Sequence, residues 1–250
     1  MRTTARTAKQ DSDVPPPAEL PGLTPEVYAR WRASEIGATT ERLERKLILE
    51  RIGDVRGKTV LEIGCGDGTL AVLLAEQGAK VSAIDMSEAM IQAARRRAQE
   101  RNVDVNFQVA AAERIPFEAE KFDIVVAMSI LCFIKNASPV FQEIARVLRP
   151  GGRLVIGELG KWSTWALQRR LRAWLGSQLW KRAVFRTPQG LRRLAEAAGL
   201  QPLEVRGAIY YPRWTWAARC LAPLDHRLSL VTNFGAAFLA LEARKPPAQQ

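Results

Sequence analysis

Short apolar runs alternate with amphipathic segments through most of this sequence, beginning at Lys58. Unbroken apolar runs are typical of strands buried on both faces of a parallel sheet, and the amphipathic segments between them suit crossover helices. The alternation predicts an α/β fold with a Rossmann-like, doubly wound, seven-stranded sheet that is mostly parallel. The expected strands lie at residues 59–63, 80–84, 105–109, 122–128, 153–158, 203–210 and 236–242, and the helices between them at 70–77, 88–101, 139–148 and 188–198.

Capping signals predict where several of these helices begin and end. The pairs Ser138-Pro139 and Thr187-Pro188 predict helix starts, because a hydroxyl oxygen caps the first turn and proline suits the position after it. Ser87 is placed as the N-cap of the second of these helices. Gly78 and Gly199 stand where a helix C-terminus calls for a left-handed residue.

Two further helices are expected before the alternating region. Thr24 followed by Pro25 predicts a short helix that carries Tyr28 and Trp31. The apolar spacing predicts a second helix over residues 40–52.

Length and composition limit the domain organisation. A chain of 250 residues with 47% hydrophobic content can bury one sizeable core, so we expect a single domain over residues 23–250 with a binding core at 58–159. Residues 1–22 hold charges and three consecutive prolines but no apolar run, which predicts a disordered leader. Charges interrupt the apolar runs well before the roughly 20 residues that a membrane span requires.

The cysteines and the histidine argue against metal or disulfide chemistry. Cys65, Cys132 and Cys220 are scattered, and His226 is the only histidine. This spacing matches neither a disulfide framework nor a metal-ligand set, so we expect no metal and a reducing, cytoplasmic setting.

The stretch VLEIGCGDGTL, from Val60 to Leu70, carries the most specific chemical information. A buried strand ends there in a turn with glycine at 64, 66 and 68, and the turn opens directly into a helix. Glycine lets a ligand approach the main chain where a Cβ would collide, so the turn predicts a nucleotide-like ligand. An ordinary strand-to-helix turn is the alternative interpretation.

Asp85 strengthens the first interpretation, because it follows the second strand about 20 residues after the turn, where Rossmann-type folds place the acid that receives two ribose hydroxyls. Thr69 stands where a third glycine of the dinucleotide motif would be expected, and Glu62 and Asp67 flank the turn. Two carboxylates disfavour the pyrophosphate of NAD and favour a ligand with sulfonium and ammonium groups. For Glu62, bracing of the loop and direct ligand contact both remain open.

With these motifs the sequence resembles the class I S-adenosylmethionine-dependent methyltransferases, in particular the small-molecule branch with the ubiquinone and menaquinone C-methyltransferases. The matching stretches are VLEIGCGDGTL, VSAIDMSEAMI, AAERIPFEAEKFDIVVA and RVLRPGGRLVIGEL, and the final AAFLALEARK is similar to the family's antiparallel seventh strand. The resemblance implies an enzyme that uses S-adenosylmethionine.

The resemblance also implies which residues contact the cofactor. Gly64 and Gly66 correspond to positions beside the methionyl part, and Asp85 to the residue that holds the ribose. Ala111 stands where many relatives carry an acid, which leaves adenine recognition to the neighbouring positions. The full set implied for the cofactor is Glu62, Gly64, Cys65, Gly66, Asp85, Met86 on the adenine, Ala112 and Glu113 at the adenine edge, and Met128 in the methionyl pocket.

No catalytic residue is assigned from the sequence. Methyl transfer from a sulfonium is an in-line displacement that needs alignment and a dry site, so a dedicated base is not required. His226 beside Asp225, and the residues Tyr28, Tyr210 and Tyr211, are the available proton acceptors, each with a structural alternative.

Nucleobase modification is disfavoured by the motifs that would accompany it. Cys132 lacks the preceding proline of RNA cytosine methyltransferases, and Met128 is not followed by the [DN]PP[YF] run of amino-methylating DNA enzymes. We therefore expect a small-molecule acceptor and no nucleic acid.

Two segments interrupt the alternation, at residues 160–186 and 212–233, and they are expected to cap the ligand crevice. The net charge of +11 is concentrated in and just after the first of them, since nine basic and no acidic residues lie between Lys161 and Arg193. Residues 161–186 also hold four tryptophans, and Leu167, Leu171, Trp174, Leu175 and Leu179 are spaced to share one helical face.

Two interpretations of this basic, aromatic segment compete. Its apolar face either docks on the core as a lid or lies in a membrane surface, which would place the enzyme on the inner membrane face. A single-stranded RNA platform is a third interpretation.

The resulting functional hypothesis is methyl transfer to a small hydrophobic or anionic acceptor at carbon, oxygen or nitrogen. The alternatives are a peripheral membrane enzyme that methylates a lipid or quinone precursor, and a non-catalytic module that binds S-adenosylmethionine.

Overall fold

The computed structural model describes residues 24–248. The leader expected at residues 1–22 lies outside the described part of the chain.

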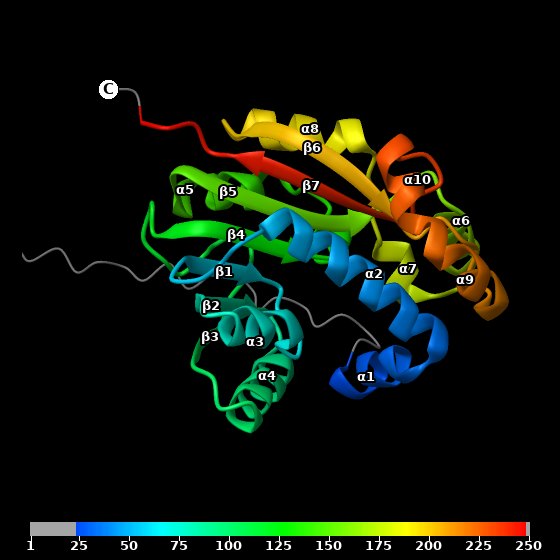
Figure 1. Cartoon of the computed structure of the whole chain (residues 1–250), viewed down its shortest axis with the longest axis horizontal. Helices are drawn as coiled ribbons and strands as arrows, with labels where there is room; N and C mark the ends of the chain where they lie inside the picture. Colours follow the sequence, from blue (N-terminus) through cyan, green and yellow to red (C-terminus); the bar gives the residue numbers. More distant parts are fainter. Residues whose placement is uncertain (1–23, 249–250) are drawn as a thin grey trace, which may run out of the picture.

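A seven-stranded sheet in the order β3-β2-β1-β4-β5-β7-β6 forms the centre of the structure (Figure 1). Strands β1 to β5 pair in parallel, whereas β7 lies between β5 and β6 and runs antiparallel to both. The expected doubly wound sheet with an antiparallel last strand is therefore confirmed. The strands are β1 (Thr59–Ile63), β2 (Lys80–Asp85), β3 (Val105–Val109), β4 (Phe122–Met128), β5 (Leu148–Leu159), β6 (Gln201–Ala208) and β7 (Phe238–Arg244).

Helices cover both faces of this sheet. On one face, α2, α3 and α4 contribute Ile48, Leu74 and Ile91 to a buried core. On the other face, Phe141 of α5 and Leu191 of α8 join a second core. The helices are α1 (Pro25–Ala33), α2 (Glu35–Ile52), α3 (Thr69–Glu76), α4 (Glu88–Glu100), α5 (Ser138–Val147), α6 (Thr164–Trp174), α7 (Gln178–Arg182), α8 (Pro188–Ala197), α9 (Thr215–Leu221) and α10 (Asp225–Val231), with 3₁₀ turns η1 (Leu131–Phe133) and η2 (Ala222–Leu224).

Most predicted boundaries agree with the structure to within two residues, and three differ for identifiable reasons. Strand β5 begins at Leu148 rather than at residue 153, because Leu148 already pairs with Phe122 of β4. Helix α2 begins at Glu35 rather than near residue 40, because the Ser34 hydroxyl caps its first turn by accepting from the Gly37 N–H. Ser138 is not an N-cap; it is the first residue of α5, and the cap position is Ala137 without a side-chain hydrogen bond. Thr24, Ser87 and Thr187 cap their helices as expected.

The two interrupting segments lie beyond the carboxyl ends of the parallel strands, together with α1 and the first half of α2 (Figure 1). The first segment forms two helices, α6 and α7, rather than one continuous helix, because Gly176 between them has φ +106°. Within the described residues, no helix is long and apolar enough to cross a membrane.

Helix α6 does not dock through its predicted apolar face. The exposed fractions of Leu167, Leu171 and Trp174 are 69%, 53% and 81%, and Leu175 is exposed as well. Trp165 and Ala166 are buried in their place, and the Trp165 ring N–H donates to the Tyr211 carbonyl over 2.8 Å. The expectation that the leucine face packs on the core as a lid is therefore wrong.

Candidate functional site

The carboxyl ends of four parallel strands meet where the strand order reverses, between β1 and β4. The register aligns Ile63 with Ile84 on one side and with Ala127 on the other, while Asp85 is opposite Val109. This switch point is where open α/β sheets bind ligands. It brings together the predicted cofactor residues that follow β1, β2, β3 and β4.

The three glycines of the turn after β1 differ in what surrounds them. All have positive φ, at +71°, +53° and +76° for Gly64, Gly66 and Gly68. A Cβ on Gly64 would come within 2.5 Å of Ile130, and one on Gly68 within 2.7 Å of Ala94, whereas one on Gly66 would meet no atom within 4 Å. Gly66 therefore faces the open space where a ligand can approach the main chain.

Asp85 fastens this turn to the end of β2. Its carboxylate accepts from the Gly66 N–H over 2.8 Å and from the Ser87 N–H over 2.9 Å. Burial raises the pKa of Asp85 against the opposing effect of these hydrogen bonds. Each carboxylate oxygen can accept about two hydrogen bonds and accepts one here, so both oxygens keep capacity for ligand hydroxyls.

The segment after β3 lies beside Asp85. The Ala110 N–H donates to the Asp85 carbonyl over 3.0 Å, which positions the following turn. Ala112 is buried there, while Glu113 is exposed. Met86, directly after Asp85, is half-buried.

Glu62 and Cys65 are buried beneath the turn. Glu62 is 3% exposed, and its Oε2 is buried without a hydrogen-bond partner among residues 24–248. Burial raises the pKa of Glu62 to about 8. The Cys65 thiol is oriented toward the Gly66 carbonyl, at 3.7 Å. Met128 ends β4 and is half-buried.

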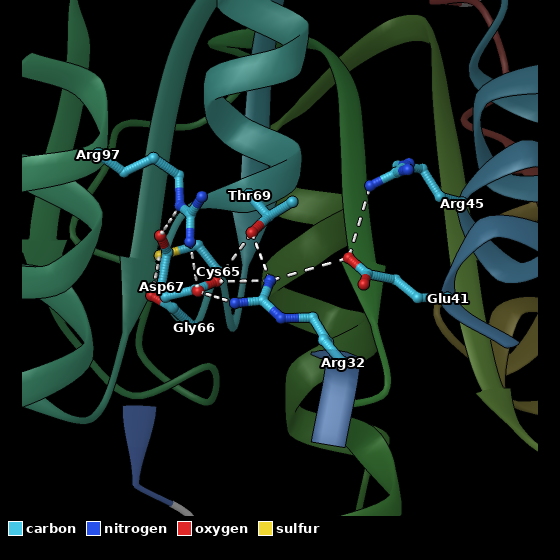
Figure 2. Close-up of polar contacts among 8 residues, drawn as sticks. All are labelled: Arg32, Glu41, Arg45, Cys65, Gly66, Asp67, Thr69 and Arg97. Atoms are coloured by element: carbon cyan, nitrogen blue, oxygen red, sulfur yellow. Dashed lines mark hydrogen bonds and ion pairs between the residues drawn. The ribbon is translucent and has the colours of Figure 1, made fainter. Parts of the chain in front are cut away.

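Asp67 does not act as the free negative charge expected from the sequence (Figure 2). Its carboxylate pairs with Arg32 of α1 and with Arg97 of α4, the latter over 2.7 Å, and accepts from the Thr69 hydroxyl over 3.0 Å. Burial alone would raise the pKa of Asp67, but the two arginines lower it. Because two arginines pair with Asp67, its charge is not free to attract a cationic ligand, which corrects that part of the interpretation from the sequence.

Arg32 is a site residue that the sequence did not reveal. Its guanidinium donates to Asp67 and to the Thr69 hydroxyl, the latter over 2.6 Å, and lies 4.7 Å from the centre of the Tyr28 ring. Helix α1 is thereby held over the glycine turn (Figure 2). The only local signal was that Tyr28 and Arg32 are four residues apart in an expected helix.

The other proton acceptors considered from the sequence have structural partners. His226 is exposed, and Asp225 accepts from the backbone N–H groups of Ile209 and Tyr210 rather than orienting the imidazole. The Tyr210 hydroxyl donates to the Thr232 carbonyl. Tyr211 shares a hydrogen bond with Thr40 over 3.2 Å.

The buried Cys132 thiol is also engaged, since it donates to the Ser129 carbonyl over 3.2 Å. Burial raises the pKa of Cys132 well above its usual value. A thiol in this environment is a poor nucleophile.

The raised pKa of Glu62 makes the stability of the fold depend on pH. The folded protein keeps a proton on Glu62 up to about pH 8, whereas the unfolded chain releases it near 4.5. The contribution of the protonated Glu62 carboxyl to the free energy of unfolding is therefore complete below about pH 4.5. It is lost as the pH rises toward 8, and the free energy of unfolding falls by about 1.4 kcal/mol per pH unit in this range. We expect Glu62→Gln to gain stability relative to the wild type between about pH 5 and about pH 8, measured by urea unfolding. The exposed Glu118→Gln serves as control, and a pH-independent difference for Glu62→Gln would contradict the prediction.

Removal of Arg32 should loosen α1 from the glycine turn. We expect Arg32→Met to lower the free energy of unfolding by about 2 kcal/mol, because it leaves a buried carboxylate with fewer partners. In a double-mutant cycle, Arg32→Met with Asp67→Asn should cost less than the sum of the two single changes. Arg30→Met, on the exposed side of α1, is the matched control. Strict additivity would show that the pair contributes nothing.

A family model described as a methyltransferase domain matches residues 61–156. A ubiquinone biosynthesis O-methyltransferase from Aeromonas salmonicida is 32% identical over 179 residues, which cover 66% of this chain and 72% of that protein. A protein of the same name from Coxiella burnetii is 29% identical over 171 residues, covering 63% and 70%.

Solved structures share the fold at lower identity. A methyltransferase from Thermotoga maritima, described as a possible histamine N-methyltransferase, aligns with a TM-score of 0.67 and 22% identity, covering 88% of this chain and 95% of that one. The magnesium protoporphyrin IX methyltransferase of Synechocystis, solved with bound S-adenosylhomocysteine, aligns with a TM-score of 0.64 and 19% identity, covering 87% and 92%. The sequence matches and the fold together show that this chain belongs to the S-adenosylmethionine-dependent methyltransferases.

Proposed function

We propose that this methyltransferase binds S-adenosylmethionine in the crevice at the β1/β4 switch point and transfers its methyl group to a small hydrophobic or anionic acceptor. The observation that carries the proposal is the arrangement around Asp85, whose carboxylate borders the open space over Gly66.

Two features of the crevice fit the cofactor. The space over Gly66 would take the methionyl part against the main chain, with Gly64 and Cys65 continuing the same turn. The unpartnered Oε2 of Glu62 is an acceptor beneath that turn and would receive a hydrogen bond from the cofactor's ammonium group, directly or through water. Met128 would line the methionyl pocket from the end of β4.

The remaining predicted contacts would hold the nucleoside. Asp85 would accept from the two ribose hydroxyls, as the corresponding acid does in Rossmann-type sites. Met86 would pack on the adenine, and Ala112 and Glu113 would border its edge. The exposure of Glu113 leaves its side chain free to turn toward the base.

The cofactor, when bound, supplies a methyl group already activated by its sulfonium. What the chain must add is alignment of the acceptor and exclusion of water. Helix α1, held by Arg32, and the segments at 160–186 and 212–233 are the parts of the chain in position to cover the crevice. We further propose that residues 23–250 form a single domain whose cofactor-binding core is residues 58–159.

The names of the relatives favour an oxygen as the methylated atom. Both sequence relatives described above are O-methyltransferases of ubiquinone biosynthesis. An aromatic hydroxyl on an otherwise apolar molecule agrees with the hydrophobic or anionic acceptor expected from the sequence.

A second candidate, a peripheral membrane enzyme, is supported by the exposed side chains of α6. Leu167, Leu171 and Trp174 present an apolar surface to solvent, and exposed basic residues lie near them in the sequence. Trp and Leu bordered by Arg and Lys suit the interface of an anionic membrane. The exposed basic residues of this segment are Arg170, Arg172, Lys181 and Arg182.

Calorimetric titration with S-adenosylmethionine and, separately, with NAD tests the cofactor site. We expect binding of S-adenosylmethionine only, weakened roughly tenfold or more in Asp85→Ala because a charge-assisted hydrogen bond is lost. Asp54→Ala, exposed before β1, should bind as the wild type does. Unchanged affinity in Asp85→Ala would overturn the ribose assignment, and absence of binding to folded protein would overturn the site.

Vesicle co-sedimentation tests the membrane candidate. We expect the protein to sediment with phosphatidylglycerol-containing vesicles at moderate salt, and the bound fraction to fall by about fivefold or more in Leu171→Asp/Trp174→Asp, since two apolar side chains are removed from the interface. Leu203→Asp, an exposed position on β6, is the control. Equal sedimentation of the double variant and the wild type would rule out α6 as the contact.

A further inference from the structure

Two side chains from distant parts of the chain hold the 3₁₀ turn η1, which follows the end of β4. Glu158, near the end of β5, is fully buried, and its Oε1 accepts from the Leu131 N–H over 2.7 Å. Arg186, the last residue of the first interrupting segment, donates from one guanidinium nitrogen to the carbonyls of Leu131 and Ile134, over 3.2 Å and 3.1 Å. The first residue of the turn is therefore held at both of its backbone polar groups.

Main-chain hydrogen bonds hold the end of the interrupting segment against the same part of the sheet. The Arg186 N–H donates to the Leu159 carbonyl over 2.9 Å, and Gly160 forms a parallel bridge with Arg186. Two residues earlier, the Val184 N–H donates to the Cys132 carbonyl in η1 over 2.7 Å. Residues 184–186 therefore connect the segment that contains α6 and α7 to the turn after β4.

The residue before η1 contacts the glycine turn. A Cβ on Gly64 would meet three side-chain carbon atoms of Ile130, the nearest at 2.5 Å, so the Ile130 side chain lies directly against the main chain at Gly64. Ser129, one residue earlier, has φ +57°, which is unfavourable for a residue with a Cβ and persists only where the surroundings determine it. The path from β4 into η1 thus requires support, and Glu158 and Arg186 provide it.

The two supporting side chains are held at some cost to stability. The Oε2 of Glu158 and the Nε of Arg186 are buried without a hydrogen-bond partner among residues 24–248. Burial raises the pKa of Glu158 to about 8, and the charge of Arg186 is the main effect that opposes this shift. Buried polar atoms without partners lower the free energy of unfolding, and such exceptions are expected mainly at functional sites.

We propose that Arg186 is a positioning residue of the cofactor site. Through η1 it holds Ile130 against the glycine turn, and it thereby couples the segment at 160–186 to the crevice. The coupling is reciprocal, because a ligand that favours this arrangement of the turn must also favour the docked arrangement of the segment. This inference rests on the proposed function, in which the cofactor binds over Gly66.

Calorimetric titration of the full chain with S-adenosylhomocysteine tests the coupling. We expect Arg186→Met to weaken binding by about fivefold or more, because Ile130 is no longer held against Gly64. Ile130→Ala removes the same contact, so the double variant should bind at most about twofold more weakly than the weaker single variant. Arg153→Met is the matched control: the Arg153 guanidinium also donates to two main-chain carbonyls, at the end of α2, and its loss should lower stability without changing the affinity.

Amide hydrogen exchange followed by NMR tests the coupling in the opposite direction. We expect S-adenosylhomocysteine to slow exchange of the Val184 and Arg186 N–H groups by about fivefold or more in the wild type, and to have no such effect in Ile130→Ala. The Leu175 N–H is the control, because it donates to the Leu171 carbonyl within α6 and not to η1.

Three outcomes would each overturn the coupling: unchanged affinity in folded Arg186→Met, additive effects of Arg186→Met and Ile130→Ala, or equal exchange at Val184 with and without ligand. If Arg186→Met does not fold, the exchange measurement on the wild type and Ile130→Ala decides. Failure of the wild type to bind S-adenosylhomocysteine would instead overturn the cofactor assignment, and the coupling with it.

Discussion

The hydrogen bonds of the Asp85 carboxylate to Gly66 and Ser87 are the interaction on which the rest of the site depends. They connect the turn after β1 to the start of the helix after β2, so that one carboxylate holds the beginnings of two consecutive crossover connections. Parallel pairing alone aligns the strand ends but does not determine the path of a loop with three positive φ angles. With the turn held from one side by Asp85 and from the other by Arg32 through Asp67, the space over Gly66 keeps a defined shape.

The buried carboxyl groups of Asp67, Glu62 and Glu44 differ in how the cost of burying their charge is offset. Two arginines pair with the Asp67 carboxylate and offset the free-energy cost of burying its charge. Glu62 and Glu44 lack such partners, so burial favours their protonated forms. Isolated buried charges are costly, and groups of this kind persist mainly where a ligand or a reaction uses them. Glu158 of β5 is a third carboxyl of this kind, since it is fully buried, its Oε2 has no hydrogen-bond partner among residues 24–248, and burial raises its pKa to about 8.

The sequence predicted the part of this molecule that backbone chemistry determines. Apolar runs and capping residues predicted the strands and most helix starts, and the glycine spacing predicted the turn after β1, because these signals act over a few residues. The same reasoning failed for Asp67, whose charge depends on Arg32 and Arg97 from helices distant in the chain. Local patterns identify elements, whereas the electrostatic state of a carboxyl depends on which elements pack against it.

The apolar periodicity of helix α6 predicted the wrong face as the buried one. Leu167, Leu171 and Trp174 recur every three to four residues and so predicted a docking face, but Trp165 and Arg169 recur with the same period on the opposite side. The fold turns the second set inward: Trp165 is buried and its indole N–H donates to the Tyr211 carbonyl, while the partly buried Arg169 guanidinium lies over the Trp165 ring.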